Sequence, residues 1–333
     1  MSSSTKMIEI TKNMRIAFEL NTCPGDSVLI ITDSGQDSDV WMGVATAGRS
    51  YGCEVVVALM ADPRETHKAL PPRPIIEAMK TADLTISATS KEFHTGGHFR
   101  YATNAGRKFL IMEEVTPDML MGPAVKADYH LMNEVGPRLK EVMDRGGSWH
   151  ITSESGTDFK CQVKPKTGRW VACKADTTNN GWGIALASFP DGEFGADPIR
   201  GTGNGIMVWD TSVHHPQGLL REPIVLTIKD GLVTKIEGGK EAQQLKEYMK
   251  KYSEGLNNEF DLELSIGFNP QCPITGILRT DKKHYGKIHT AVGDLDKGQL
   301  HIDGVTLEPT IQVGDQIVVD KGIIKIPPLD TWV

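Results

Sequence analysis

Two histidines and an aspartate in the last fifth of the chain are residue types that bind metals. His289 precedes an apolar run at residues 290–292 that predicts a strand, and twelve positions later the chain reads His301-Ile302-Asp303. Residues two apart in a strand point to the same face, so the imidazole of His301 and the carboxylate of Asp303 would project together. Imidazole nitrogen and carboxylate oxygen suit a first-row divalent metal. The spacing predicts a metal site, and a simple hydrogen-bonded His-Asp pair is the alternative.

Two glutamates could add ligands to this site. Glu193 follows residues 189–192, Phe-Pro-Asp-Gly, which are typical of a surface turn. Glu263 alternates with apolar residues in the run 262–266, so it should lie on the polar face of a strand. If that face lines a cleft, Glu263 is a ligand, and if it faces solvent, Glu263 has no role in binding.

Four other histidines have open roles. His214 and His215 follow Asp210 in a stretch typical of a solvated loop. His94 and His98 come just after a predicted strand, where open α/β sheets place ligand contacts, although a cap or turn explains them equally well.

The first half of the chain alternates short apolar strands with amphipathic helices, which predicts a doubly wound α/β layer. The expected strands are residues 27–33, 54–60, 84–89 and 109–112, and the expected helices are residues 6–23, 40–51, 75–80, 99–107, 116–121 and 128–145. This pattern predicts a flavodoxin-like domain at residues 1–147.

The second half has a different rhythm of short strands separated by tight turns, which predicts a mainly antiparallel α+β domain. The expected strands are residues 149–153, 159–163, 170–173, 206–209, 224–229 and 233–237, and one helix is expected at residues 240–252. We place the domain boundary between residues 147 and 148, so the predicted metal site belongs to a catalytic domain at residues 148–333.

Composition excludes several classes of protein. The 333 residues are 39% hydrophobic and 24% charged, and no apolar run reaches the roughly 18 residues that span a bilayer. The net charge of −7, with basic residues scattered, argues against nucleic-acid binding. Residues 1–6 start no secretion signal, and the five cysteines are odd in number and widely spaced, so we expect a cytoplasmic protein with reduced thiols and a small-molecule or short peptide substrate.

Several of these segments together resemble the leucyl aminopeptidase T family of metallopeptidases. They are residues 189–193, 222–239, 263–270, 286–293 and 301–304. The resemblance implies an N-terminal α/β domain, a metal-binding C-terminal domain and a homodimer. It also implies two neighbouring divalent ions, such as zinc, cobalt or manganese, bound by Glu193, Glu263, His289, His301 and Asp303, with Glu193 or Glu263 as proton shuttle.

The chain departs at one position from that family and at another from a related enzyme, which leaves the activity open. Those peptidases have a tyrosine near the metals where this chain has Asp296. The chain also resembles 2,5-dihydroxypyridine 5,6-dioxygenase, a relative that uses one ferrous ion. The resemblance implies that the iron site of that enzyme has a histidine at the position of Glu263. Even so, His289, His301 and Asp303 by themselves supply the two imidazoles and one carboxylate that suit ferrous iron.

Our leading hypothesis is a metal-dependent hydrolase that cleaves an amide or related C–N bond of a small substrate through a metal-activated water. The alternative is an Fe(II)-dependent dioxygenase that opens a hydroxylated pyridine ring. A metal-stabilised binding protein without turnover is the third possibility.

Overall fold

The computed structural model describes residues 3–61, 71–92, 97–177, 183–252, 260, 263–293 and 300–332. The chain forms two compact units, and each combines two stretches of the sequence. The first unit consists of Met1–Asn133 and Val171–Asp191, and the second consists of Glu134–Trp170 and Gly192–Val333. Within the described ranges, no helix has both the length and the apolar character needed to cross a bilayer. The domain boundary between residues 147 and 148 stays a prediction, because compactness does not establish which segments fold independently.

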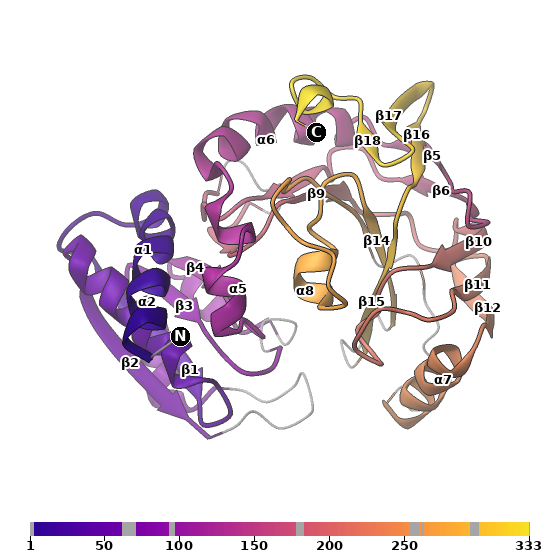
Figure 1. Ribbon diagram of the computed structural model, residues 1–333. Coiled ribbons are helices and arrows are strands. Elements are labelled where there is room, and N and C mark those ends of the chain that lie inside the picture. Colours follow the sequence, from indigo (N-terminus) through magenta and orange to yellow (C-terminus); the bar gives the residue numbers. More distant parts are fainter. Residues whose placement is uncertain are drawn as a thin grey trace. The chain divides into compact units, whose positions relative to one another are not determined.

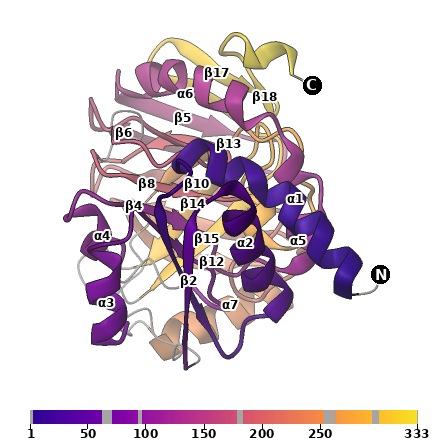
Figure 2. The same ribbon diagram turned by 90° about the vertical axis from the view of Figure 1, so that its left-hand side faces the viewer.

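Parallel strands in the order β2-β1-β3-β4-β8 form the sheet of the first unit. The strands are β1 Ser27–Asp33, β2 Glu54–Met60, β3 Leu84–Ser87, β4 Lys108–Ile111 and β8 Leu186–Ser188. The helices of this unit are α1 Ser3–Asn21, α2 Ser38–Tyr51, α3 Arg73–Met79, α4 Arg100–Thr103, α5 Pro117–Met121 and the 3-10 turn η2 Ala124–Lys126. Helices α1 and α2 lie on one side of the sheet and α3 and α4 on the other (Figure 2). The predicted alternation of strands and helices is confirmed, and β8 is a strand that the sequence did not reveal.

Both faces of β1 are buried, which explains its continuous apolar run. Leu29 and Ile31 pack with Ile75 and Met79 of α3 in one hydrophobic core. Gly43 of α2 faces Ile10 of α1, and a Cβ added at Gly43 would lie 2.4 Å from Cγ2 of Ile10. Glycine therefore lets these two helices approach closely.

Two sheets make up most of the second unit (Figure 1). The larger sheet has the order β12-β11-β10-β6-β5-β16-β17-β18, and the smaller has the order β15-β14-β13-β9-β7. The strands of the larger sheet are β5 Gly147–Thr152, β6 Asp158–Val163, β10 Asn204–Trp209, β11 Ile224–Lys229, β12 Leu232–Glu237, β16 Thr310–Val313, β17 Gln316–Asp320 and β18 Ile323–Ile324. The strands of the smaller sheet are β7 Arg169–Val171, β9 Glu193–Ala196, β13 Leu264–Gly267, β14 Ile288–Gly293 and β15 His301–Thr306. The expectation of a mainly antiparallel second half is confirmed, since the described ladders within these two sheets are antiparallel, whereas β8 joins the parallel sheet of the first unit.

Short helical segments complete the second half of the chain. They are α7 Lys240–Tyr252, α8 Leu278–Asp281 and η3 Leu329–Thr331, and helix α6 Tyr129–Met143 precedes β5. The two sheets are linked through Trp209 of β10, whose Nε1 donates a hydrogen bond to Oγ1 of Thr290 at 2.8 Å. This contact fixes β14, the strand of His289, against the larger sheet.

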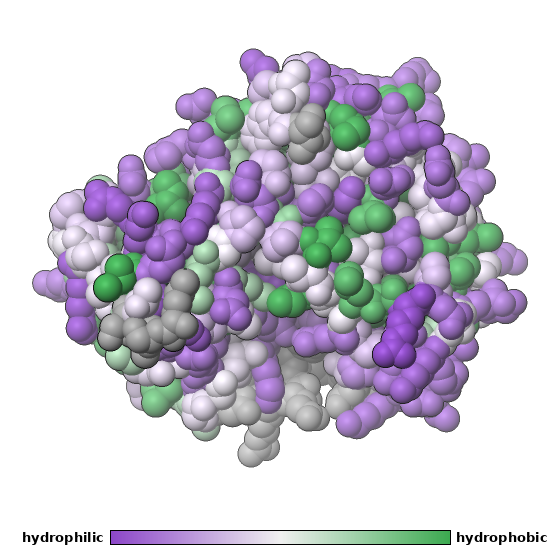
Figure 3. All heavy atoms as spheres, viewed as in Figure 1, coloured by the Kyte–Doolittle hydropathy of each residue, from purple (hydrophilic) through white to green (hydrophobic). Residues whose placement is uncertain are grey.

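The surface and the thiols agree with the composition. On the face drawn in Figure 3, hydrophilic side chains cover most of the surface and hydrophobic ones form small separate groups. All five cysteines are free, and only Cys23 is exposed. The expectation of mostly buried thiols is confirmed.

Candidate metal centre

The register of the smaller sheet places two glutamates and a histidine on one face. Ser265 of β13 lies opposite His289 of β14, and residues directly opposite one another share a face. Glu263 precedes Ser265 by two positions and points the same way. On the other side of β13, Glu193 of β9 lies opposite Gly267, which follows Ser265 by two positions. Glu193, Glu263 and His289 therefore project together although three separate segments supply them.

The same face continues onto the neighbouring strand. Asp303 of β15 lies opposite Ala291, and His301 lies opposite Gly293. Ala291 and Gly293 follow His289 at steps of two, so the register brings His301 and Asp303 to the face of His289. The predicted same-face placement of His301 and Asp303 is confirmed, and Ile302 between them is buried as expected.

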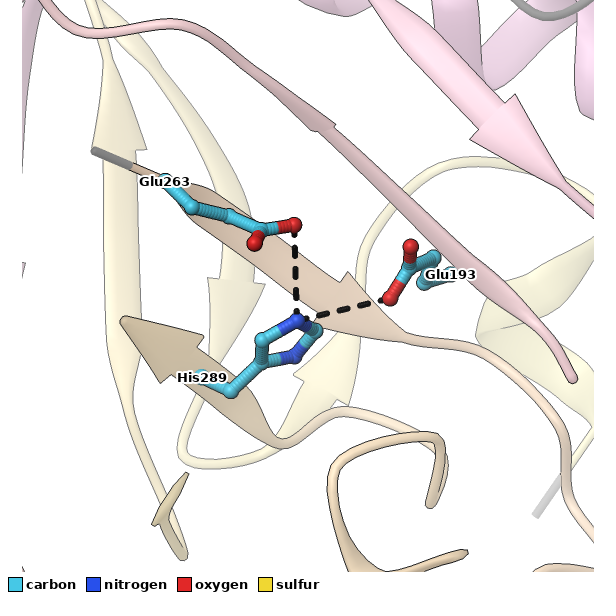
Figure 4. A group of neighbouring side chains, drawn as sticks. All are labelled: Glu193, Glu263 and His289. Carbon is cyan, nitrogen blue, oxygen red and sulfur yellow. Dashed lines mark ion pairs between the residues drawn. The ribbon is translucent and has the colours of Figure 1, made fainter. Parts of the chain in front are cut away.

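Glu193, Glu263 and His289 converge on one point, and we call them the Glu193 group. The Nε2 atom of His289 lies 3.4 Å from Oε2 of Glu193 and 3.6 Å from Oε1 of Glu263. Figure 4 shows both carboxylates directed toward the imidazole ring. Glu193 is buried, so the expectation of a surface turn before it is wrong: Phe189 and Asp191 are buried as well.

Glu263, His301 and Asp303 form a second convergence, which we call the His301 group. The Nε2 atom of His301 lies 2.9 Å from Oδ1 of Asp303 and 3.4 Å from Oε2 of Glu263. Glu263 thus belongs to both groups and offers a different oxygen to each. The face that carries Glu263 is lined by the other four side chains, so the solvent-facing alternative for Glu263 is wrong.

Three cations surround these ligands. Lys282 follows α8, and its Nζ lies 2.6 Å from Oδ2 of Asp303. Lys283 has only 4% of its side chain exposed and binds Oε2 of Glu193. Arg169 of β7 donates from Nη2 to Oε1 of Glu263 at 3.1 Å and from Nη1 to Asp197. Sequence reasoning missed all three, and the adjacent pair Lys282-Lys283 just before the strand of His289 was the available signal.

Burial and charge shift the proton affinities of this cluster. Burial by itself lowers the pKa of His301, but Asp303 and Glu263 reverse this and hold it well above its usual value. Burial by itself raises the pKa of Asp303, yet Lys282 and His301 hold it well below its usual value. For Glu263, the neighbouring His289, His301 and Arg169 likewise outweigh burial and lower the pKa. Glu263 and Asp303 are therefore ionised at neutral pH.

The donor set fits a divalent metal. Two ligand atoms that each lie about 2.1 Å from one ion are separated by roughly 3.0 to 3.4 Å at right or tetrahedral angles, close to the distances within both groups. His289 is fully buried, and neither of its nitrogens has a hydrogen-bond partner within the described part of the chain. Oδ1 of Asp303 also lacks a hydrogen-bond partner there. Buried polar atoms without hydrogen bonds are costly, and bound metal would satisfy Nε2 of His289 and Oδ1 of Asp303.

Neither His214 nor His215 belongs to the two groups. His215 stacks on the ring of Tyr248, with centroids 4.2 Å apart. The backbone N–H of His214 donates to the carbonyl oxygen of Asp303 at 3.0 Å, and Ser212 and Val213 are buried, so the expected solvated loop instead packs along β15. His98 is buried in the first unit, and His94 and Asp296 lie outside the described residues.

An α/β unit with a parallel sheet, together with an antiparallel unit that carries clustered carboxylates and imidazoles, defines a metal-binding enzyme of mixed α/β fold. The chain belongs to the family described as NicX, 2,5-dihydroxypyridine 5,6-dioxygenase, whose model matches residues 9–325. The suspected family is thereby confirmed, and the match supports the dioxygenase alternative better than the hydrolase hypothesis. None of the curated proteins matches the chain.

Two solved structures share the fold. The 2,5-dihydroxypyridine dioxygenase from Pseudomonas putida KT2440 superposes with a TM-score of 0.81 at 16% identity, with 99% of each chain covered. The wild-type AmpT from Thermus thermophilus superposes with a TM-score of 0.67 at 14% identity, covering 96% of this chain and 99% of that one. At these identities the superpositions establish the fold alone.

Proposed function

We propose that this protein is an Fe(II)-dependent ring-cleaving dioxygenase that acts on a hydroxylated pyridine such as 2,5-dihydroxypyridine. The observation that carries the proposal is the family match over residues 9–325, a range that contains every candidate ligand. The clustering of these ligands on one sheet face supports it.

The candidate iron ligands are His289, His301 and Asp303, with Glu263 beside them. Two imidazoles and a carboxylate with open positions suit ferrous iron, which when bound supplies a redox-active centre for oxygen chemistry. We assign to Glu193 and Glu263 the transfer of the proton of a substrate hydroxyl, because both carboxylates lie in the same cluster.

The surrounding cations would orient the ligands and attract the substrate. The Lys282 ammonium holds one oxygen of Asp303 and leaves Oδ1 directed at His301. Because Lys282 remains 20% exposed, its charge is also available to a deprotonated ring hydroxyl. Arg169 fixes Glu263 through one guanidinium nitrogen.

A metal-dependent hydrolase is the second candidate. One observation favours it: two ligand groups share Glu263, and paired ions that share a carboxylate are typical of hydrolytic centres. Zinc, cobalt or manganese would then replace iron, and the substrate would be an amide or short peptide.

The test is oxygen consumption by anaerobically purified protein loaded with ferrous iron. With 2,5-dihydroxypyridine and a panel of related hydroxypyridines, we expect substrate-dependent oxygen uptake and loss of the ring absorbance. His301→Ala should abolish both, whereas His130→Ala, at a half-exposed position in the first unit, should not. Absence of uptake with iron bound, together with amide hydrolysis by zinc- or manganese-loaded protein, would select the hydrolase.

The homodimeric state and the cytoplasmic location stay predictions. Sedimentation of the purified protein tests the first of them directly.

A further inference from the structure

The two ligand groups differ in what binds their oxygen atoms. In the Glu193 group, the oxygens nearest to His289 are Oε2 of Glu193 and Oε1 of Glu263. Lys283 binds the first of these through its ammonium group. The second accepts hydrogen bonds from Arg169 at 3.1 Å and from Ser265 at 2.8 Å. Both oxygens that would face an ion in this group are therefore already bound by cationic side chains.

The His301 group has the opposite arrangement. Its converging oxygens are Oδ1 of Asp303 and Oε2 of Glu263, and each forms an ion pair only with His301 within the described part of the chain. The cation nearest to Asp303, Lys282, binds the other oxygen, Oδ2. This group therefore presents two carboxylate oxygens toward a shared point without a lysine or arginine between them.

Charge balance gives a second reason for the difference. Four carboxylates, those of Glu193, Glu263, Asp303 and Asp197, surround three cationic side chains, Arg169, Lys282 and Lys283. One divalent ion would leave this cluster with a small positive charge. A second ion would add two more positive charges to a buried cluster, and uncompensated buried charge is strongly unfavourable.

We infer that the ammonium group of Lys283 takes the place of a second ion in the Glu193 group, which leaves the single ion of the proposed function at the His301 group. The Nε2 atom of His289, which lies 3.6 Å from Oε1 of Glu263, is available to the same single ion. Glu193 is not a ligand, because Lys283 holds the oxygen that it would use. The inference deepens the proposed function and rests on the same ligand residues.

The first experiment measures stoichiometry. Metal-free protein is titrated with Mn²⁺ by calorimetry, and the ions retained after dialysis are counted by elemental mass spectrometry. We expect one ion per wild-type chain and none retained by His301→Ala. Two ions per wild-type chain would overturn the inference.

The second experiment changes the lysine. Lys283→Met keeps the apolar stem and removes the ammonium group, so Glu193 becomes available and we expect a second Mn²⁺ per chain. The double variant Glu193→Gln with Lys283→Met also lacks the Glu193 carboxylate, so the number of bound Mn²⁺ ions per chain should return to one. A folded Lys283→Met protein that still binds one ion would contradict the inference.

Loss of the buried ammonium group removes the lysine partner of Glu193, so we expect Lys283→Met to lower stability. We then expect Mn²⁺ to raise the melting temperature of Lys283→Met more than that of the double variant, because a ligand that binds only the folded state stabilises it. Equal shifts would contradict the inference. These readouts are independent of turnover: one bound ion without oxygen uptake refutes the proposed function and leaves the ion count intact.

Discussion

His301 and Asp303 lie two positions apart on strand β15, and their Nε2 and Oδ1 atoms are 2.9 Å apart. Oδ1 has no hydrogen bond in the described part of the chain, because the contact with His301 lacks hydrogen-bond geometry. Two such atoms held this close without a hydrogen bond between them are suited to bind the same ion, which supports the proposed metal site.

Replacing His301 by Ala should remove the bound ion. We expect the metal affinity to fall at least about 100-fold, because even partners outside the ligand set change affinity by 10–100-fold. Equilibrium dialysis with elemental analysis measures this loss, and far-UV circular dichroism should stay close to that of wild type. Full metal content in this variant would refute the assignment of His301 as a ligand, and His130→Ala serves as the matched control.

Arg169 should be important for stability as well as for the site. Its guanidinium is 4% exposed and is bound to Asp197, Glu263 and Ser265, so Arg169→Met leaves buried acceptors without their donor. We expect a loss of about 3–5 kcal/mol in the free energy of unfolding. Arg107→Met, which removes a 40% exposed guanidinium paired with Asp83, should cost less than about 1 kcal/mol. Chemical denaturation of both variants gives the comparison, and equal losses would contradict the argument.

Asp83 predicts a pH dependence of stability in the first unit. Hydrogen bonds from the backbone and hydroxyl of Ser27, together with Arg107, lower its pKa below the ordinary value of 3.8. A carboxyl group whose pKa is lower in the folded state stabilises the protein at pH values above its pKa in the unfolded state. This contribution is lost as the pH falls through its pKa in the folded state. Asp83→Asn should therefore destabilise the protein by about 1 kcal/mol or less at pH 7, since the carboxylate is partly exposed.

The difference between wild type and Asp83→Asn should shrink below about pH 4. Urea denaturation at pH 7, 5 and 3 measures it. A difference that stays constant or grows toward pH 3 would rule out the carboxylate as its source.

Gly304 should tolerate no side chain. A Cβ at this position would lie 1.9 Å from Cδ2 of Trp209, and Gly304 directly follows Asp303. Gly304→Ala should lower the free energy of unfolding by about 1–3 kcal/mol or more and weaken metal binding, because β15 or the indole must move. Adding Trp209→Phe should recover part of the stability, and failure to recover any would show that the clash is not with the indole.

Much of the fold could be predicted from local sequence patterns. The parallel strands from β1 to β4 and the helices α1, α2 and α6 were expected within a few residues of their bounds, because burial imposes a period of two or 3.6 on short segments. Strand β8 was not expected, since three residues are too few to show a hydrophobic period. This segment is a strand because it pairs with β4, which lies far away in the sequence.

For the candidate site, strand geometry alone predicts that His301 and Asp303 share a face, because residues two apart in a strand point the same way. Residue types and spacing also predict Glu193, Glu263 and His289 as candidate ligands, and the family resemblance joins them to the same site. How these side chains meet, and which cations hold them, follows from the tertiary structure. Arg169 reaches Glu263 across 94 positions and Lys283 reaches Glu193 across 90, and contacts at such separations depend on strand order and register, which local patterns do not encode.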